Sequence, residues 1–110
     1  MTDDKAARIR ALNDALRQKF EGGRILLTCG LTERGPDFVL RVVEGVRAFD
    51  AFTEANDPFR EHDFGALEID GQMVFFKIDY YDPAYEFGAQ DPSDEATCSR
   101  VLTIMLAEEY

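Results

Sequence analysis

His62, the only histidine in the chain, lies between two carboxylates, Glu61 and Asp63. A neighbouring carboxylate raises the proton affinity of an imidazole, so this residue is a candidate general acid or general base. It is also a candidate metal ligand together with Asp57, Glu61 or Asp63. Adjacent residues of a strand point to opposite faces, which disfavours a shared metal site. A lone histidine is more often structural, and both alternatives stay open.

A second candidate set is Lys77, Asp79 and Tyr81, which alternate along a predicted strand. Alternation places their side chains on one face at intervals of roughly 6.6 Å. The lysine could act as a catalytic base or a phosphate clamp, or it could form an ion pair on an otherwise apolar surface. No Gly-rich phosphate loop, GxSxG elbow or zinc signature accompanies it, which favours a non-enzymatic protein.

Aromatic and acidic residues follow each other at the end of this strand and in the loop after it. Aromatic side chains inside an acidic rim are typical of an interface for a basic partner. The alternative is that the rings pack at the edge of the core. The predicted partner-binding residues are Tyr80, Tyr81, Asp82, Tyr85, Glu86 and Asp91.

The charge of the chain restricts its partners. The 110 residues contain 22 acidic and 12 basic side chains, a net charge of −10. Such a balance repels phosphate backbones, so direct nucleic-acid binding is not expected, whereas a basic protein or nucleoprotein surface is a suitable partner. With 45% apolar residues the chain is expected to fold as one globular domain over residues 1–110.

A β-hairpin over residues 64–81 is the most specific structural prediction. Asp70 and Gly71 form a favoured pair for a two-residue type I′ turn, because both positions need positive φ. The flanking segments, 64–69 and 72–81, are rich in aromatic and β-branched residues that suit strands.

The short turn also determines which residues of the hairpin share a face. It pairs Ile69 with Gln72 and Leu67 with Val74, so one face is apolar and belongs to the core. The other face carries charged residues among apolar ones, and continued alternation would place His62 there as well.

The remaining elements are predicted from apolar spacing. Ile9, Leu12, Leu16 and Phe20 indicate a helix over 3–20. A strand is expected over 24–29, a turn over 30–35 and a helix over 36–54, although the β-branched run at 37–43 also fits a strand. Asp91-Pro92 and the apolar residues from Cys98 to Leu106 predict a last helix.

The order α-β-α-β-β-α predicts an α+β fold. In it, a small antiparallel sheet of about three strands packs against about three helices. The helices would cover one face, leaving the face with Lys77, Asp79 and Tyr81 partly open.

The two cysteines, Cys29 and Cys98, lack CxxC spacing, and small buried side chains are the favoured interpretation over a disulfide or a metal site. The N-terminal segment lacks the apolar core of a signal peptide, and no apolar run approaches ~18 residues. A reduced cytoplasmic protein with no membrane contact and no cofactor is therefore expected.

Four stretches carry a resemblance to known sequences: LNDALR, NDPFREHDFG, KIDYYD and the closing RVLTIMLAEEY. Together they resemble a proteobacterial family of small proteins classed as a domain of unknown function, often encoded on plasmids and other mobile elements. The resemblance spans nearly the whole chain. It implies no activity and no site residue.

Two functions follow as hypotheses. The first is a non-enzymatic binding protein that docks on a basic protein surface, with inhibition of a host CRISPR or restriction complex as its specific form. Small acidic proteins of mobile elements resemble such inhibitors in size and charge. The second is a small hydrolase or transferase that uses His62 and Lys77 with Asp79 or Tyr81. An open sheet face would also suit a homodimer.

Overall fold

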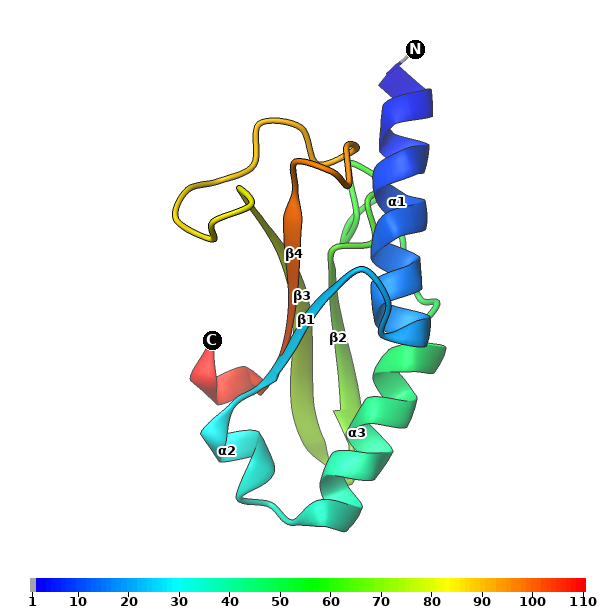
Figure 1. Cartoon of the computed structure of the whole chain (residues 1–110). Coiled ribbons are helices and arrows are strands. Elements are labelled where there is room, and N and C mark those ends of the chain that lie inside the picture. The colour runs from blue at the N-terminus through cyan, green and yellow to red at the C-terminus, as the bar shows by residue number, and fades with distance from the viewer. Residues whose placement is uncertain (1) are drawn as a thin grey trace.

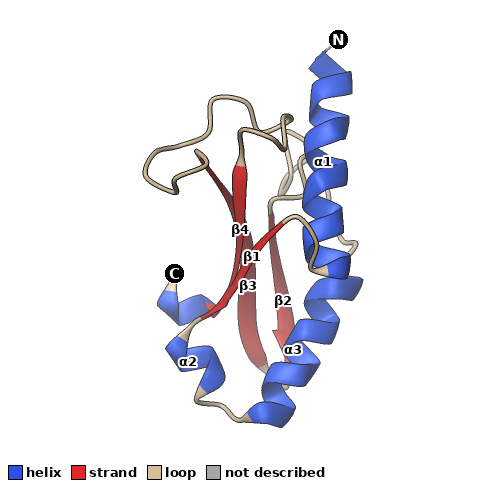
Figure 2. Ribbon diagram, viewed as in Figure 1, coloured by secondary structure: helices blue, strands red, loops and turns tan. Residues whose placement is uncertain are grey.

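The computed structural model describes the backbone of residues 2–110 and the side chains of residues 4–110. The predicted α+β class is confirmed, with three helices and a four-stranded mixed sheet (Figure 2). In chain order the elements are α1 (Thr2–Lys19), β1 (Gly23–Leu27), α2 (Cys29–Thr32), α3 (Pro36–Ala48), β2 (Phe64–Ile69), β3 (Gln72–Tyr81), β4 (Ser99–Leu106) and the 3-10 turn η1 (Ala107–Glu109).

The sheet has the order β1-β4-β3-β2, so β4 lies between β1 and β3. It pairs parallel with β1 and antiparallel with β3. Helices α1 and α3 cover one face, whereas the segment after β3 and the C-terminal turn lie on the opposite side (Figure 1). The core fills the space between these helices and the sheet, where Leu16, Val42, Phe76 and Leu102 are fully buried.

The prediction of a last helix is wrong, because residues 99–106 form the strand β4. Val101 and Leu102 are both buried, since this strand is covered on its two faces. A continuous apolar run matches a helical spacing as well as a strand spacing, and here the pairing with two neighbouring strands decides the outcome. The sheet is therefore mixed with four strands, and the element order is α-β-α-α-β-β-β.

Two other boundaries differ from the prediction. The expected turn over 30–35 contains the short helix α2, and the second predicted helix ends at Ala48 instead of residue 54. Residues 37–43 are helical, because Pro36 begins α3 and Gly35, with φ 99°, turns the chain into it. Beyond the helix, the rings of Phe49 and Phe52 still pack together, with centroids 4.9 Å apart.

The hairpin prediction is confirmed in its turn and register. Asp70 and Gly71 have φ values of 52° and 77°, as a type I′ turn requires. Leu67 pairs with Val74 and Ile69 with Gln72. The core face of the hairpin is therefore the predicted one.

No helix in the described residues has the length and apolar character needed to cross a membrane. Both cysteines are free. Cys98 is buried as expected, but Cys29 is exposed at the start of α2, which corrects the prediction of two buried side chains.

Candidate functional site

His62 lies on the helix-covered side of the sheet, away from Lys77. The strand geometry of β2 begins at Phe64, and the φ of His62 is 56°, so the alternation does not extend back to this residue. This corrects the predicted placement. The imidazole instead stacks on Phe52, with ring centroids 3.8 Å apart and planes within 5°.

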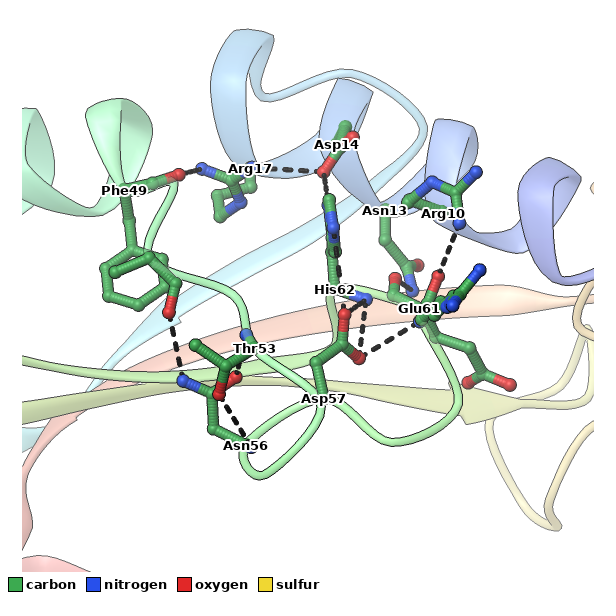
Figure 3. A network of polar contacts seen from close by, with 12 residues as sticks. Arg10, Asn13, Asp14, Arg17, Phe49, Thr53, Asn56, Asp57, Glu61 and His62 are labelled. Carbon is green, nitrogen blue, oxygen red and sulfur yellow. Dashed lines mark hydrogen bonds and ion pairs between the residues drawn. The ribbon is translucent and has the colours of Figure 1, made fainter.

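Two carboxylates face the two ring nitrogens of His62, and neither is the predicted neighbour Glu61 or Asp63 (Figure 3). Nδ1 lies 2.8 Å from Oδ1 of Asp14, on α1. Because a carboxylate only accepts hydrogen bonds, Nδ1 carries the hydrogen. Nε2 lies 3.7 Å from Oδ2 of Asp57. We call His62, Asp14, Asp57 and Phe52 the His62 site.

Asp57 holds the backbone of the His62 site in place. Its side chain is only 5% exposed, and Oδ1 accepts hydrogen bonds from the backbone N–H groups of Glu61 (3.1 Å) and His62 (3.2 Å). Both Arg60 and His62 have positive φ, which is uncommon for residues other than glycine. The buried carboxylate thus offsets the conformational cost of this segment.

A buried polar network adjoins the His62 site. The Asn13 side chain, fully buried on α1, donates to the Glu61 carbonyl (2.9 Å) and to the Tyr80 hydroxyl (2.8 Å). Its carbonyl oxygen accepts from Nε of Arg100 (2.8 Å), whose guanidinium also donates to the Pro92 carbonyl. The network therefore joins α1, the loop before β2, β3 and β4.

Tyr80 belongs to this network. Its hydroxyl donates to the Glu61 carboxylate at 2.8 Å. Burial is the main cause that raises the pKa of Tyr80, so the phenol stays protonated and keeps donating. Of the six predicted partner-binding residues, this one faces the core.

Arg17 connects the His62 site to α3. The guanidinium donates to Asp14 (3.0 Å) and to the carbonyls of Val46 (3.0 Å) and Phe49 (2.8 Å) at the end of α3. The side chain is 2% exposed. It therefore satisfies helix carbonyls and fixes the carboxylate that faces His62.

The structure does not bring the alternative catalytic residues together. Lys77, Asp79 and Tyr81 lie on the opposite sheet face from His62, as the burial of alternating β3 residues shows. Lys77 Nζ pairs with Asp79 at 2.9 Å, and this hydrogen bond raises the pKa of the lysine. A lysine held protonated is a poor general base. Among the described residues, no cluster of three or more histidine, cysteine or acidic side chains is arranged to hold a metal ion.

The other predicted binding residues lie in or beside the segment 82–97, which we call the acidic loop. The rings of Tyr81 and Tyr85 lie 6.3 Å apart, and the guanidinium of Arg24 lies 3.9 Å from the Tyr85 centroid. Asp82 and Asp91 line a pocket of about 600 Å³ within the loop. Glu86 is exposed.

Four residues that hold His62 and Tyr80 were not predicted as site residues: Asn13, Asp14, Arg17 and Arg100. A signal was present for three of them. Asn13 and Arg17 follow Ile9 at helical spacing, within the apolar stripe of α1. Arg100 lies two residues before Leu102, on the same buried face of β4. Polar side chains at core-facing positions indicate a buried network.

The pKa of Asp63 gives a test of this region. Burial, reinforced by the charge of Glu61, raises the pKa of Asp63 above its ordinary value of 3.8. The folded state therefore binds the proton of Asp63 more tightly than the unfolded state does. This contribution to stability is fully present below pH 3.8 and is lost as the pH rises through the pKa of the folded state. Asp63→Asn should raise the free energy of unfolding at pH 7 and leave it unchanged below pH 3.8, as measured by urea unfolding at the two pH values.

The control is Asp50→Asn, at an exposed position. An equal gain in stability for both variants would contradict the prediction.

A family model described as a protein of unknown function, DUF3768, matches residues 27–109. The chain belongs to this family. The DUF3768 region begins at the last residue of β1, so it includes His62, Asp57 and the acidic loop, whereas α1 lies before it. Asn13, Asp14 and Arg17 thus support the site from outside the DUF3768 region. No curated protein matches the chain, and no solved structure does.

Proposed function

We propose that this DUF3768 protein is a non-enzymatic binding protein that takes a basic protein segment on its acidic loop. One observation carries the proposal. Asp82, Asp91 and Asp94 line the same pocket of about 600 Å³, together with Phe87, whose ring is 70% exposed. A lysine or arginine side chain with an apolar neighbour is complementary to such a surface.

The charge of the acidic loop supports this proposal. Residues 79–97 contain six acidic and no basic side chains. The hydroxyl of Ser93 is the main cause that lowers the pKa of Asp91, which therefore stays ionised in mildly acidic solution. Lys5 lies 3.3 Å from Asp91, but both side chains are about half exposed, so this ion pair contributes little stability.

Internal hydrogen bonds hold the acidic loop in one conformation. The Asp82 N–H donates to the Phe87 carbonyl (2.7 Å), and Asp82 Oδ1 accepts from the Glu86 N–H (2.9 Å). The Ala89 N–H donates to the Tyr80 carbonyl (3.2 Å). A preformed loop loses less conformational entropy on binding than a flexible one.

Arg24 shows that the loop accommodates a guanidinium. Its side chain lies over the Tyr85 ring at 3.9 Å. Such stacking is favourable for cations, and the exposed ring of Phe87 offers a comparable surface to an incoming basic side chain.

The proposal predicts a local effect of charge on binding. Glu86→Lys combined with Glu95→Lys should weaken binding of an arginine-rich peptide by about tenfold or more, measured by fluorescence anisotropy at low salt. Affinity of the unaltered protein should fall at moderate salt. Asp82 and Asp91 accept hydrogen bonds within the loop, so a second variant replaces them by asparagine, which removes the charge and keeps an acceptor oxygen.

The control has the same change of net charge elsewhere. Glu33→Lys with Glu44→Lys alters two exposed residues on the α2 and α3 side of the molecule. Equal loss of affinity in both double variants would show attraction by net charge alone and would reject the loop as a docking site.

Inhibition of a host CRISPR or restriction complex is the most specific form of this proposal. Its support is the small size of the protein, its acidic charge and its resemblance to mobile-element proteins. These are arguments by analogy and do not come from a site. An affinity pull-down from the native host, with the Glu86 and Glu95 variant as comparison, tests it. Recovery of a basic nucleoprotein complex by the unaltered protein alone is the expected result.

A further inference from the structure

A second pocket, of about 370 Å³, opens beside the ring of His62. It lies between α1 and the loop before β2 (Figure 3). The residues that line it are Arg10, Phe52, Thr53, Glu54, Asp57, Arg60 and His62. The docking function proposed above does not use this pocket.

Two arginines of this pocket lack carboxylate partners. No ion pair joins Arg10 or Arg60 to an acidic side chain within residues 4–110, although the chain contains 22 acidic residues. The Arg10 guanidinium is oriented by one hydrogen bond, from NH1 to the Arg60 carbonyl at 3.0 Å. Its remaining N–H groups are available to a ligand.

Two acidic residues, Glu54 and Asp57, also line the pocket, and no ion pair joins either of them to Arg10 or Arg60 among the described residues. Asp57 is buried and already accepts the backbone N–H groups of Glu61 and His62. Glu54 is exposed at the surface. The cationic donors that line the pocket and have no carboxylate partner among the described residues are therefore the guanidinium groups of Arg10 and Arg60.

The backbone around these donors has an uncommon conformation. Arg60 and His62 have φ values of 57° and 56°, two positive values within three residues. Non-glycine residues in this region cluster at ligand-binding sites, where the surrounding structure fixes them. Here Asp57 supplies that support through the backbone bonds to residues 61 and 62.

We propose that this pocket binds the oxyanion of a small molecule, a phosphate monoester or a carboxylate. Arg10 and Arg60, which both line the pocket, are its charged ligands, because the planar fork of a guanidinium group matches the geometry of such oxyanions. His62 lies at the wall of the pocket, with Asp14 holding its Nδ1 atom at 2.8 Å.

The test is a 1H–15N NMR titration with inorganic phosphate, and separately with acetate, at constant ionic strength. We expect saturable shifts of the backbone amides of Asp57 and of residues 59–62, and of the His62 ring. Stronger binding of phosphate would identify a phosphate ester as the ligand class, and stronger binding of acetate a carboxylate. No saturable shift with either anion would overturn the proposal.

Matched variants separate a site from general attraction. Arg10→Gln and Arg60→Asn should each weaken binding at least fivefold, and asparagine tolerates the positive φ of residue 60. Arg8→Gln removes an exposed arginine of the same helix that does not line this pocket, and it should leave the affinity unchanged. Equal weakening by Arg8→Gln would overturn the proposal. The double variant at Glu86 and Glu95 should bind the anion normally, so this test is independent of the docking function.

Discussion

Replacing Arg17 by alanine should lower the free energy of unfolding by about 3–5 kcal/mol, the cost of breaking a buried charge pair by removing one partner. The guanidinium is almost fully buried and donates to Asp14 and to carbonyls at the end of α3. Its removal leaves the Phe49 carbonyl without this donor, the Val46 carbonyl with only the backbone N–H of Phe49 (3.3 Å), and Asp14 with one partner fewer. Urea unfolding followed by circular dichroism measures the loss.

Two further variants isolate the cause. Arg17→Lys keeps the charge but cannot reach several acceptors from one planar group, so it should recover only part of the stability. Lys19→Ala, at an exposed position of the same helix, should change stability by less than about 0.5 kcal/mol. A loss for Arg17→Ala within that range would mean that other groups satisfy the α3 carbonyls.

Gly65→Ala should destabilise the protein by about 1–3 kcal/mol, although alanine normally stabilises a strand relative to glycine by roughly 0.5–1 kcal/mol. Gly65 pairs with Phe76 across the hairpin, and an added Cβ would overlap the Phe76 ring. A carbon of the Phe49 ring would lie only 3.0 Å away. The overlap outweighs the gain because Phe76 is fully buried and cannot move aside.

A double-mutant cycle tests this packing. Combined with Phe76→Leu, Gly65→Ala should cost less than it does alone, because the smaller side chain leaves room for the methyl group. Gly88→Ala is a matched control, since the nearest atom to its added Cβ is 4.0 Å away. Additive effects of the two core substitutions in thermal unfolding would show that the ring overlap is not the cause.

The hairpin could be predicted from the sequence because its determinants are local. The Asp70-Gly71 turn sets the register, and the alternation of apolar residues then specifies the buried face. The last strand could not be predicted in the same way. Residues 99–106 are apolar at consecutive positions, and only their distant partners, β1 and β3, distinguish a buried strand from a helix.

The same difference between local and distant information applies to the site. His62 and Asp57 lie five residues apart, and the Asp57 carboxylate accepts the backbone N–H of His62 within one loop. Asp14 lies 48 residues from His62, and Asn13 lies 87 residues from Arg100. Such pairs depend on the packing of α1 against the sheet, which no local pattern encodes.

The position of β4 has a consequence for the order in which the chain can fold. This strand occupies an interior place in the sheet, yet residues 99–106 follow every other strand and helix in the sequence. During synthesis, β1 therefore has no sheet neighbour until β4 has left the ribosome, and the edge of β3 that β4 will cover stays unpaired. Closure of the sheet is a late event that brings residues about 80 positions apart together, and contacts of that separation slow folding.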